Sequence, residues 1–137
     1  FKNELGYLFQ NFGLLENETV AANLELGLIS QKLTKQEKKQ REEEVLEKVG
    51  LNYLTLDQKI YELSGGEAQR VALAKVILKD PPLILADELT AALDPETSQE
   101  VMNLLLSLKK PDRLMIIATH NPAIWEKADE VIRLNTI

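Results

Sequence analysis

The chain has no cysteine, a single histidine, a single tryptophan and an aromatic content of only 5%. The lack of cysteine excludes a disulfide framework and is compatible with a cytoplasmic protein. No apolar run approaches the roughly 20 residues that a membrane-spanning helix requires, and no secretory signal is recognisable. An excess of basic residues is also missing. The formal net charge is -6, which argues against a nucleic-acid partner.

The residues that are present suit a folded protein. Of the 137 residues, 45% are hydrophobic and 28% are charged, a balance typical of globular chains. This length allows one domain, or a large part of one, with a core of its own. The sequence opens with Phe1, inside an apolar strand-like stretch, so we expect it to be a trimmed piece of a longer protein.

Short apolar runs alternate with longer stretches that carry one apolar face. The short runs indicate buried strands and the longer stretches indicate helices. Strands are expected at 5–10, 83–86, 114–118 and 131–134, and helices at 14–28, 34–50, 65–79, 96–108 and 124–127. Pro81 and Pro82 end the third of these helices, because proline lacks the N–H donor. The alternation predicts an α/β fold with helices packed on a parallel sheet.

Polar residues follow three of the expected strands directly. Gln10 ends the first, Asp87 and Glu88 end the second, and His120 follows the third. Ligands of open parallel sheets bind beyond the carboxyl ends of the strands. Two adjacent acids there suit a magnesium site in which one binds the ion and the other handles a proton. The alternatives are that the acids only begin a helix or turn, and that His120 is a structural residue with a local hydrogen bond.

The segment Ser64-Gly65-Gly66-Glu67 begins an expected helix. Serine followed by glutamate three residues later is a capping box, which satisfies free amides of the first turn. Capping does not explain Gly65 and Gly66, each of which weakens a helix by about 1 kcal/mol relative to alanine. Close approach of a ligand to the backbone would explain them. Exposed amides at a helix N-terminus form a site suited to phosphate.

Taken together, these segments resemble the nucleotide-binding domain of ATP-binding-cassette (ABC) proteins. The matching motifs, in family order, are the Q-loop (Tyr7-Leu8-Phe9-Gln10), the signature motif (Leu63-Ser64-Gly65-Gly66-Glu67 with Gln69-Arg70), Walker B (Leu83-Ile84-Leu85-Ala86-Asp87), the catalytic glutamate (Glu88), the D-loop (Ala92-Leu93-Asp94) and the switch histidine (His120). The resemblance implies a P-loop-NTPase-like α/β fold, with a parallel sheet core flanked by helices and an added α-helical subdomain.

The resemblance also implies a division of the chain. Residues 1–137 would form a truncated ABC ATPase domain. Within it, 1–12 hold a core strand and the Q-loop, 13–62 the helical subdomain, and 63–137 the signature helix, Walker B, the D-loop and the histidine loop. About fifty residues separate Gln10 from Ser64, without the sustained heptads of a long coiled coil. This compactness favours the transporter type. The residues in and around the motifs are similar to those of the lipoprotein-release, macrolide and bacteriocin-export subgroup.

Roles for single residues follow from the resemblance. Catalysis would rest on Glu88 as base, His120 at the γ-phosphate and Gln10 near the attacking water. Magnesium would be held by Asp87 and Gln10. The ATP of a second subunit would face Ser64, Gly65, Gly66 and Glu67, with Asp94 joining the two sites. The implied cofactors are therefore ATP and Mg²⁺.

The implied function is that of the ATP-binding subunit of an ABC transporter, which couples ATP hydrolysis to transport across a membrane. Its partners would be a second ATPase subunit in a head-to-tail dimer and a transmembrane permease, with no nucleic acid. Its place would be cytoplasmic, peripheral on the inner face of the cell membrane through the permease. Two alternatives stay open: a non-transport ABC ATPase in translation or DNA maintenance, and a non-catalytic cassette that binds a partner.

One family element is absent from the sequence. The phosphate-binding loop has the pattern G-x-x-x-x-G-K-[ST], and no glycine of this chain is followed by lysine. The lysine and the amides of that loop are the main source of tight ATP binding. We therefore expect this chain by itself neither to bind ATP tightly nor to hydrolyse it. We also expect it to self-associate through exposed sheet.

Overall fold

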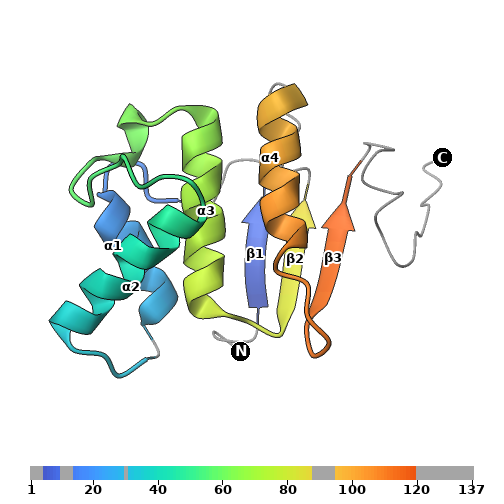
Figure 1. Cartoon of the computed structure of the whole chain (residues 1–137), viewed down its shortest axis with the longest axis horizontal. Coiled ribbons are helices and arrows are strands. Elements are labelled where there is room, and N and C mark those ends of the chain that lie inside the picture. Colours follow the sequence, from blue (N-terminus) through green and yellow to red (C-terminus); the bar gives the residue numbers. More distant parts are fainter. Residues whose placement is uncertain (1–4, 10–13, 30, 88–94, 120–137) are drawn as a thin grey trace.

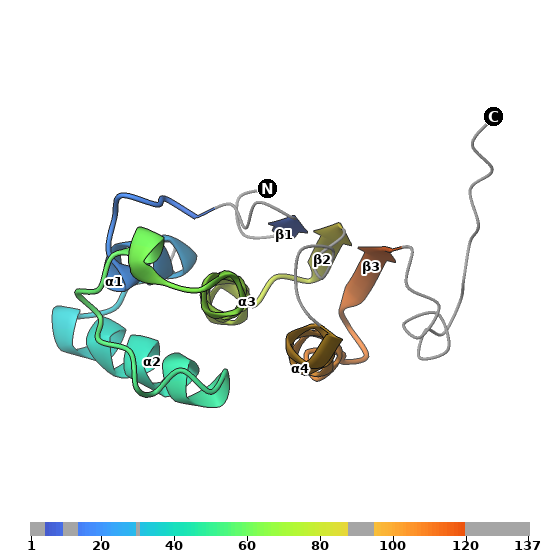
Figure 2. The same cartoon turned by 90° about the horizontal axis from the view of Figure 1, so that it is seen from above.

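The computed structural model describes residues 5–9, 14–29, 31–87 and 95–119. Its elements, in chain order, are β1 (Leu5–Phe9), α1 (Val20–Glu25), the 3₁₀ helix η1 (Leu26–Leu28), α2 (Lys35–Lys48), the 3₁₀ helix η2 (Ile60–Glu62), α3 (Gly65–Lys79), β2 (Leu83–Asp87), α4 (Pro95–Leu106) and β3 (Leu114–Ala118). Figures 1 and 2 show α3 and α4 on one side of the sheet, with α1 and α2 beyond α3. None of the helices described is long and apolar enough to cross a membrane.

The three strands form a parallel sheet in the order β1-β2-β3. β2 is the central strand, and Phe9, Asp87 and Ala118 lie opposite one another in the two ladders. Since β2 and β3 are parallel, the chain must cross from one end of the sheet to the other, and α4 makes that crossover. The predicted α/β fold with a parallel sheet is confirmed. The expected elements at 124–127 and 131–134 lie outside the described residues.

α3 is buried on two sides. Ala72, Leu73 and Val76 pack with β2 and α4 in one core cluster. Val71 and Ala74 belong to a second cluster, which is formed with α1, α2 and the segment that precedes η2. A helix that is apolar on most of its surface is stable only when it is enclosed. α3 therefore joins the sheet to the helical part of the molecule, and its position fixes both.

The stretch expected to be mainly helical at 14–28 is helical only from Val20 onward, which corrects the predicted start of this helix. α1 begins at Val20, where the Thr19 hydroxyl accepts a hydrogen bond from the Ala22 amide at 3.0 Å. The residues before it form a turn at 16–17 and an isolated antiparallel bridge between Thr19 and Lys59. The Val20 amide donates to the Gln58 carbonyl at 2.8 Å, and the Ile60 amide donates to the Glu18 carbonyl at 3.2 Å. The apolar periodicity of 14–28 continues through this segment, although its backbone groups bond to a part of the chain about forty residues away.

The other helices begin and end close to the predicted residues. Thr34 caps α2 with a complete capping box, as its spacing with Glu37 predicts. α2 ends before Gly50, whose φ of 77° lies in the left-handed region that glycine tolerates. α3 ends at Asp80, which adopts a left-handed conformation at the C-cap.

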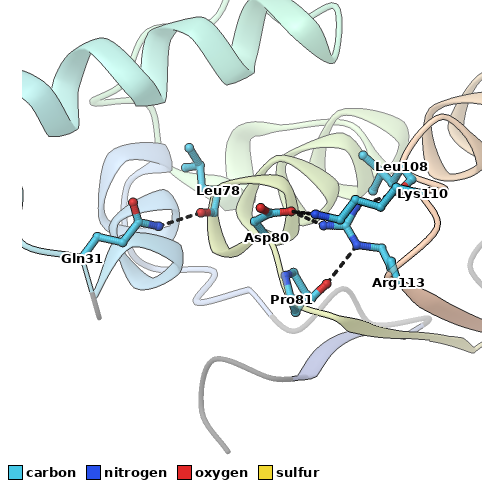
Figure 3. A network of polar contacts seen from close by, with 7 residues as sticks. All are labelled: Gln31, Leu78, Asp80, Pro81, Leu108, Lys110 and Arg113. Carbon is cyan, nitrogen blue, oxygen red and sulfur yellow. Dashed lines mark hydrogen bonds and ion pairs between the residues drawn. The ribbon is translucent and has the colours of Figure 1, made fainter.

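A polar network closes the end of the sheet where β2 and β3 begin (Figure 3). The Arg113 side chain is only 6% exposed and donates to the carbonyls of Pro81 at 2.9 Å and Leu108 at 2.7 Å. It also forms an ion pair with Asp80, as does Lys110. A buried guanidinium with several partners is well satisfied, because it offers five donors in a fixed plane. The network fixes the α3–β2 turn against the loop that enters β3.

The opposite face of β2 and β3 is apolar and partly open. Ile84 and Ala86 point into the core beneath α3 and α4, so the alternating positions point away from it. In the paired register these positions are Leu83 beside Leu114 and Leu85 beside Ile116. Leu114 is 60% exposed and Ile116 is 48% exposed. Parallel sheets are normally covered on both faces, and none of the elements described here covers this one.

Candidate functional site

The signature segment lies at the N-terminus of α3. Figure 1 shows this end of α3, and the N-terminal end of α4, on the same side as the carboxyl ends of the three strands. The predicted capping box is confirmed: the Ser64 hydroxyl accepts from the Glu67 amide at 3.2 Å, and the Glu67 carboxylate accepts from the Ser64 amide at 3.0 Å. Ser64 and Gly65 are exposed. The start of α3 is thus ordered by its own side chains and accessible from outside.

The capping geometry has a chemical consequence for Ser64. Its oxygen accepts the Glu67 amide proton, so the hydroxyl proton is left to be donated elsewhere. The positive end of the α3 dipole lies at the same place, because α3 is a regular helix of 15 residues. A hydroxyl donor at a helix N-terminus is an arrangement that suits an oxyanion such as phosphate.

Gly66 has a packing reason that the sequence did not reveal. A Cβ atom at this position would lie 2.6 Å from Cγ2 of Thr97, near the start of α4. Real Cβ contacts are essentially never that short, so a side chain at position 66 would force the Thr97 side chain or one of the two helices to shift. A ligand close to the backbone is the explanation that the sequence predicts for Gly66. The structure shows that the neighbouring helix already requires it.

Glu67 has a second partner that sequence reasoning missed. The Tyr53 hydroxyl donates to its other carboxylate oxygen at 2.6 Å. This bond, followed by those to Ser64, holds the pKa of Glu67 below its usual range. The same bond raises the pKa of the Tyr53 phenol. Tyr53 lies 14 residues before Glu67 in a turn, and no sequence pattern connects the two.

The signature helix is also tied to α4 by an ion pair. Arg70, one turn after Glu67, pairs with Glu100. The Arg70 guanidinium passes close to Gly50, where an added Cβ would lie 3.2 Å from Nη1. Gln69 is fully buried. The two residues that extend the signature motif therefore anchor α3, and the exposed part of the motif is its first turn.

The strand-end residues are placed only in part. Asp87 is the last residue of β2 and lies level with Phe9 and Ala118, so the three strands end at one edge as predicted. Gln10, Glu88, Asp94 and His120 lie outside the described residues. Within the described part of the chain, no three His, Cys, Asp or Glu side chains are grouped so that they could hold a metal ion. The roles predicted for these residues stay predictions.

A groove of about 990 Å³ lies elsewhere, between α2 and residues 52–57. None of the predicted site residues lines it. Glu43, Glu44, Glu47 and Asp57 give it an acidic lining, with Lys39 as the only cation among the lining residues. It is therefore separate from the α3 N-terminus and from the strand ends.

Comparison with known proteins agrees with this arrangement. The family model described as ABC transporter matches residues 1–91. The chain is 42% identical over 132 residues to the ABC transporter ATP-binding protein YvrO of Bacillus subtilis, covering 96% of this chain and 57% of YvrO. It is 36% identical over 116 residues to the methionine import ATP-binding protein MetN 2 of Oenococcus oeni, covering 85% of this chain and 32% of MetN 2.

Solved structures show the same fold. The ATP-binding cassette MJ0796, determined as a dimer bound to ADP and Pi, superimposes with a TM-score of 0.77 at 33% identity, over 90% of this chain and 55% of that one. CbiO1 of Clostridium perfringens, part of the transporter complex cbiONQ, gives a TM-score of 0.72 at 32% identity, over 88% and 48%. The chain belongs to the ABC transporter ATP-binding family and has the α/β fold of an ABC ATPase cassette. It spans little more than half the length of YvrO and of MJ0796.

Proposed function

We propose that this chain is the part of an ABC transporter ATP-binding subunit that carries the signature helix and the Walker B strand. The subunit would couple ATP hydrolysis to transport of a substrate across a membrane. The observation that carries the proposal is the exposed, self-capped N-terminus of α3 beside the aligned carboxyl ends of three parallel strands, in a chain of this family.

The proposed roles divide between two surfaces. At the strand ends, Asp87 and Gln10 would hold Mg²⁺, since carboxylate and amide oxygens are ligands that this ion prefers. Glu88 would act as base for the attacking water and His120 would contact the γ-phosphate. At the start of α3, the first turn from Ser64 to Glu67 would face the ATP held by a second subunit, and Asp94 would link the two sites.

The proposed partners follow from that division. A second ATPase subunit would complete each site in a head-to-tail dimer, and the MJ0796 cassette, which was determined as a dimer, supports the pairing of two subunits. A transmembrane permease would bind the pair and place it, from the cytoplasmic side, on the inner face of the cell membrane. The names of MetN 2 and CbiO1 support a transporter. Assignment of the protein to the lipoprotein-release, macrolide and bacteriocin-export subgroup rests on the sequence of the motifs alone.

The test is magnesium-dependent ATP binding and turnover, measured on this chain and on a version extended upstream to the length of the relatives. We expect activity only in the extended form, because this chain lacks the G-K-[ST] loop that binds phosphate. Glu88→Gln should remove that activity, whereas Glu47→Gln, on the exposed side of α2, should not.

Activity of the present chain that Glu88→Gln abolishes would disprove the expected inactivity. Lack of activity in both forms would instead favour a non-catalytic cassette that binds a partner's nucleotide. The observation behind that second candidate is the exposed, self-capped first turn of α3, which a partner's nucleotide could approach.

A further inference from the structure

Tyr53 is a residue to which neither the motifs nor the family membership assigns a role. It lies in the turn between α2 and η2, and its side chain is 63% exposed. Such a tyrosine adds little to the core, because most of its ring stays in water. Its distinct contribution is the hydroxyl, which donates to Glu67 Oε2 at 2.6 Å. Short hydrogen bonds to a carboxylate are stronger than those between neutral groups.

With this bond, both oxygens of Glu67 have a partner. Oε1 accepts from the Ser64 amide at 3.0 Å and Oε2 accepts from Tyr53. The carboxylate is therefore held against the helix and toward the 51–54 turn. Without the Tyr53 hydroxyl, Oε2 would be free and the side chain could rotate toward the exposed amides of the first turn.

The position of this charge matters for an anion that approaches the start of α3. A carboxylate in the first turn stabilises the helix through its dipole, but it repels a phosphate that binds at the same end. A hydrogen bond from a phenol disperses the charge of the carboxylate and keeps the carboxylate away from the position where a phosphate would bind. The bond thus reconciles helix capping by Glu67 with anion binding at Ser64.

We propose that Tyr53 is a positioning residue, which acts through Glu67 to keep the first turn of α3 open to the phosphates of a nucleotide held by a partner subunit. This inference rests on the proposed function and deepens it. Because Tyr53 acts on approach of the nucleotide and not on the reacting atoms, its loss should weaken apparent binding and leave the chemical step unchanged.

The experiment compares Tyr53→Phe with Tyr61→Phe in the extended protein. Tyr61 is 65% exposed and is the matched control. Tyr53→Phe should raise the KM for MgATP about threefold to tenfold with kcat within twofold, because the Glu67 charge is then no longer held away from the nucleotide. Tyr61→Phe should change neither constant. In a Glu67→Gln background, where no charge needs to be held back, Tyr53→Phe should change KM less than twofold.

An unchanged KM in Tyr53→Phe, or an equal rise in the Glu67→Gln background, would overturn the inference while leaving the proposed function intact. A second measurement does not depend on activity. In the present chain, NMR titration of Glu67 should show a higher pKa in Tyr53→Phe and no change in Tyr61→Phe. An unchanged Glu67 pKa would also overturn the inference. Failure of the proposed function is separate, since it would appear as an extended protein without ATPase activity.

Discussion

The side-chain amide of Asn23 pairs with both backbone polar groups of Leu15. Asn23 Oδ1 accepts from the Leu15 amide at 2.7 Å, and Nδ2 donates to the Leu15 carbonyl at 3.1 Å. Nδ2 also donates to the Thr19 carbonyl at 2.9 Å, so both N–H donors of the amide are used. Asn23 is completely buried in α1. A single side chain thereby fixes the segment that enters the helical part of the molecule.

Replacing Asn23 by alanine should lower the free energy of unfolding by about 2–4 kcal/mol, because it removes three hydrogen bonds and leaves the Leu15 amide without its partner. Urea unfolding monitored by circular dichroism measures the loss. Asn52→Ala, at an exposed position, is the control and should change stability by less than about 0.5 kcal/mol. Equal stability of the two variants would show that solvent replaces the Asn23 bonds.

The contact between Gly66 and Thr97 predicts that the effect of Gly66→Ala on stability has the opposite sign from the one usual in helices. Alanine is favoured over glycine in a helix by about 1 kcal/mol, but here its Cβ would meet Thr97 Cγ2 at 2.6 Å. Overpacking costs about 1–3 kcal/mol, so Gly66→Ala should be neutral or destabilising. In a Thr97→Ser background, which lacks that methyl group, the same change should stabilise the protein. Thermal unfolding of the wild type, the two single variants and the double variant tests this prediction. If Gly66→Ala has the same effect with threonine and with serine at position 97, the packing explanation is wrong.

Glu42 should make stability depend on pH. Its side chain is buried in α2, and burial, followed by the nearby charge of Glu25, raises its pKa from 4.5 to about 7. Lys38 opposes this shift and Glu43 adds to it. A raised pKa means that the folded protein holds a proton which the unfolded chain has lost. The stabilisation is complete below pH 4.5 and is lost as the pH rises through about 7.

Glu42→Gln should therefore remove this part of the pH dependence and should be more stable than the wild-type protein at pH 8. Glu47→Gln, on the exposed side of the same helix, should keep the wild-type profile. Denaturant unfolding between pH 4.5 and 8 measures both. A Glu42→Gln profile that still falls over this range would assign the pH dependence to other groups.

The open sheet face predicts self-association of this chain. Leu114 and Ile116, with Leu83 and Leu85 beside them, form an apolar surface that a second copy would cover. Ile116→Lys should shift the chain toward monomer at high concentration without unfolding it, because this side chain points away from the core. Ile29→Lys, at an exposed apolar position that directly follows η1 and lies outside the sheet, is the control. Light scattering measures the molar mass in solution, and a wild-type chain that stays monomeric at high concentration would refute the prediction.

Local features of the sequence predicted local structure well. The capping residues Thr34 and Ser64 mark the starts of α2 and α3, and Pro81 marks the entry to β2. These features act within a few residues, so one sequence suffices to read them. The order of strand and helix along the chain, and with it the parallel sheet, followed from the same local patterns.

The sequence by itself therefore determined the α/β class, the start of the signature helix and the candidate residues at the strand ends. Tertiary structure decided what those residues touch: Tyr53 on Glu67, Thr97 against Gly66 and Asn23 on Leu15. It also decided that residues 15–19 form a turn and a bridge instead of a helix, because their backbone groups bond to the separate segment at 59–61. The physical reason is the separation along the chain of the residues that interact. Capping and periodicity are encoded within a turn or two of chain, whereas each of these contacts depends on where packing brings two separate segments together.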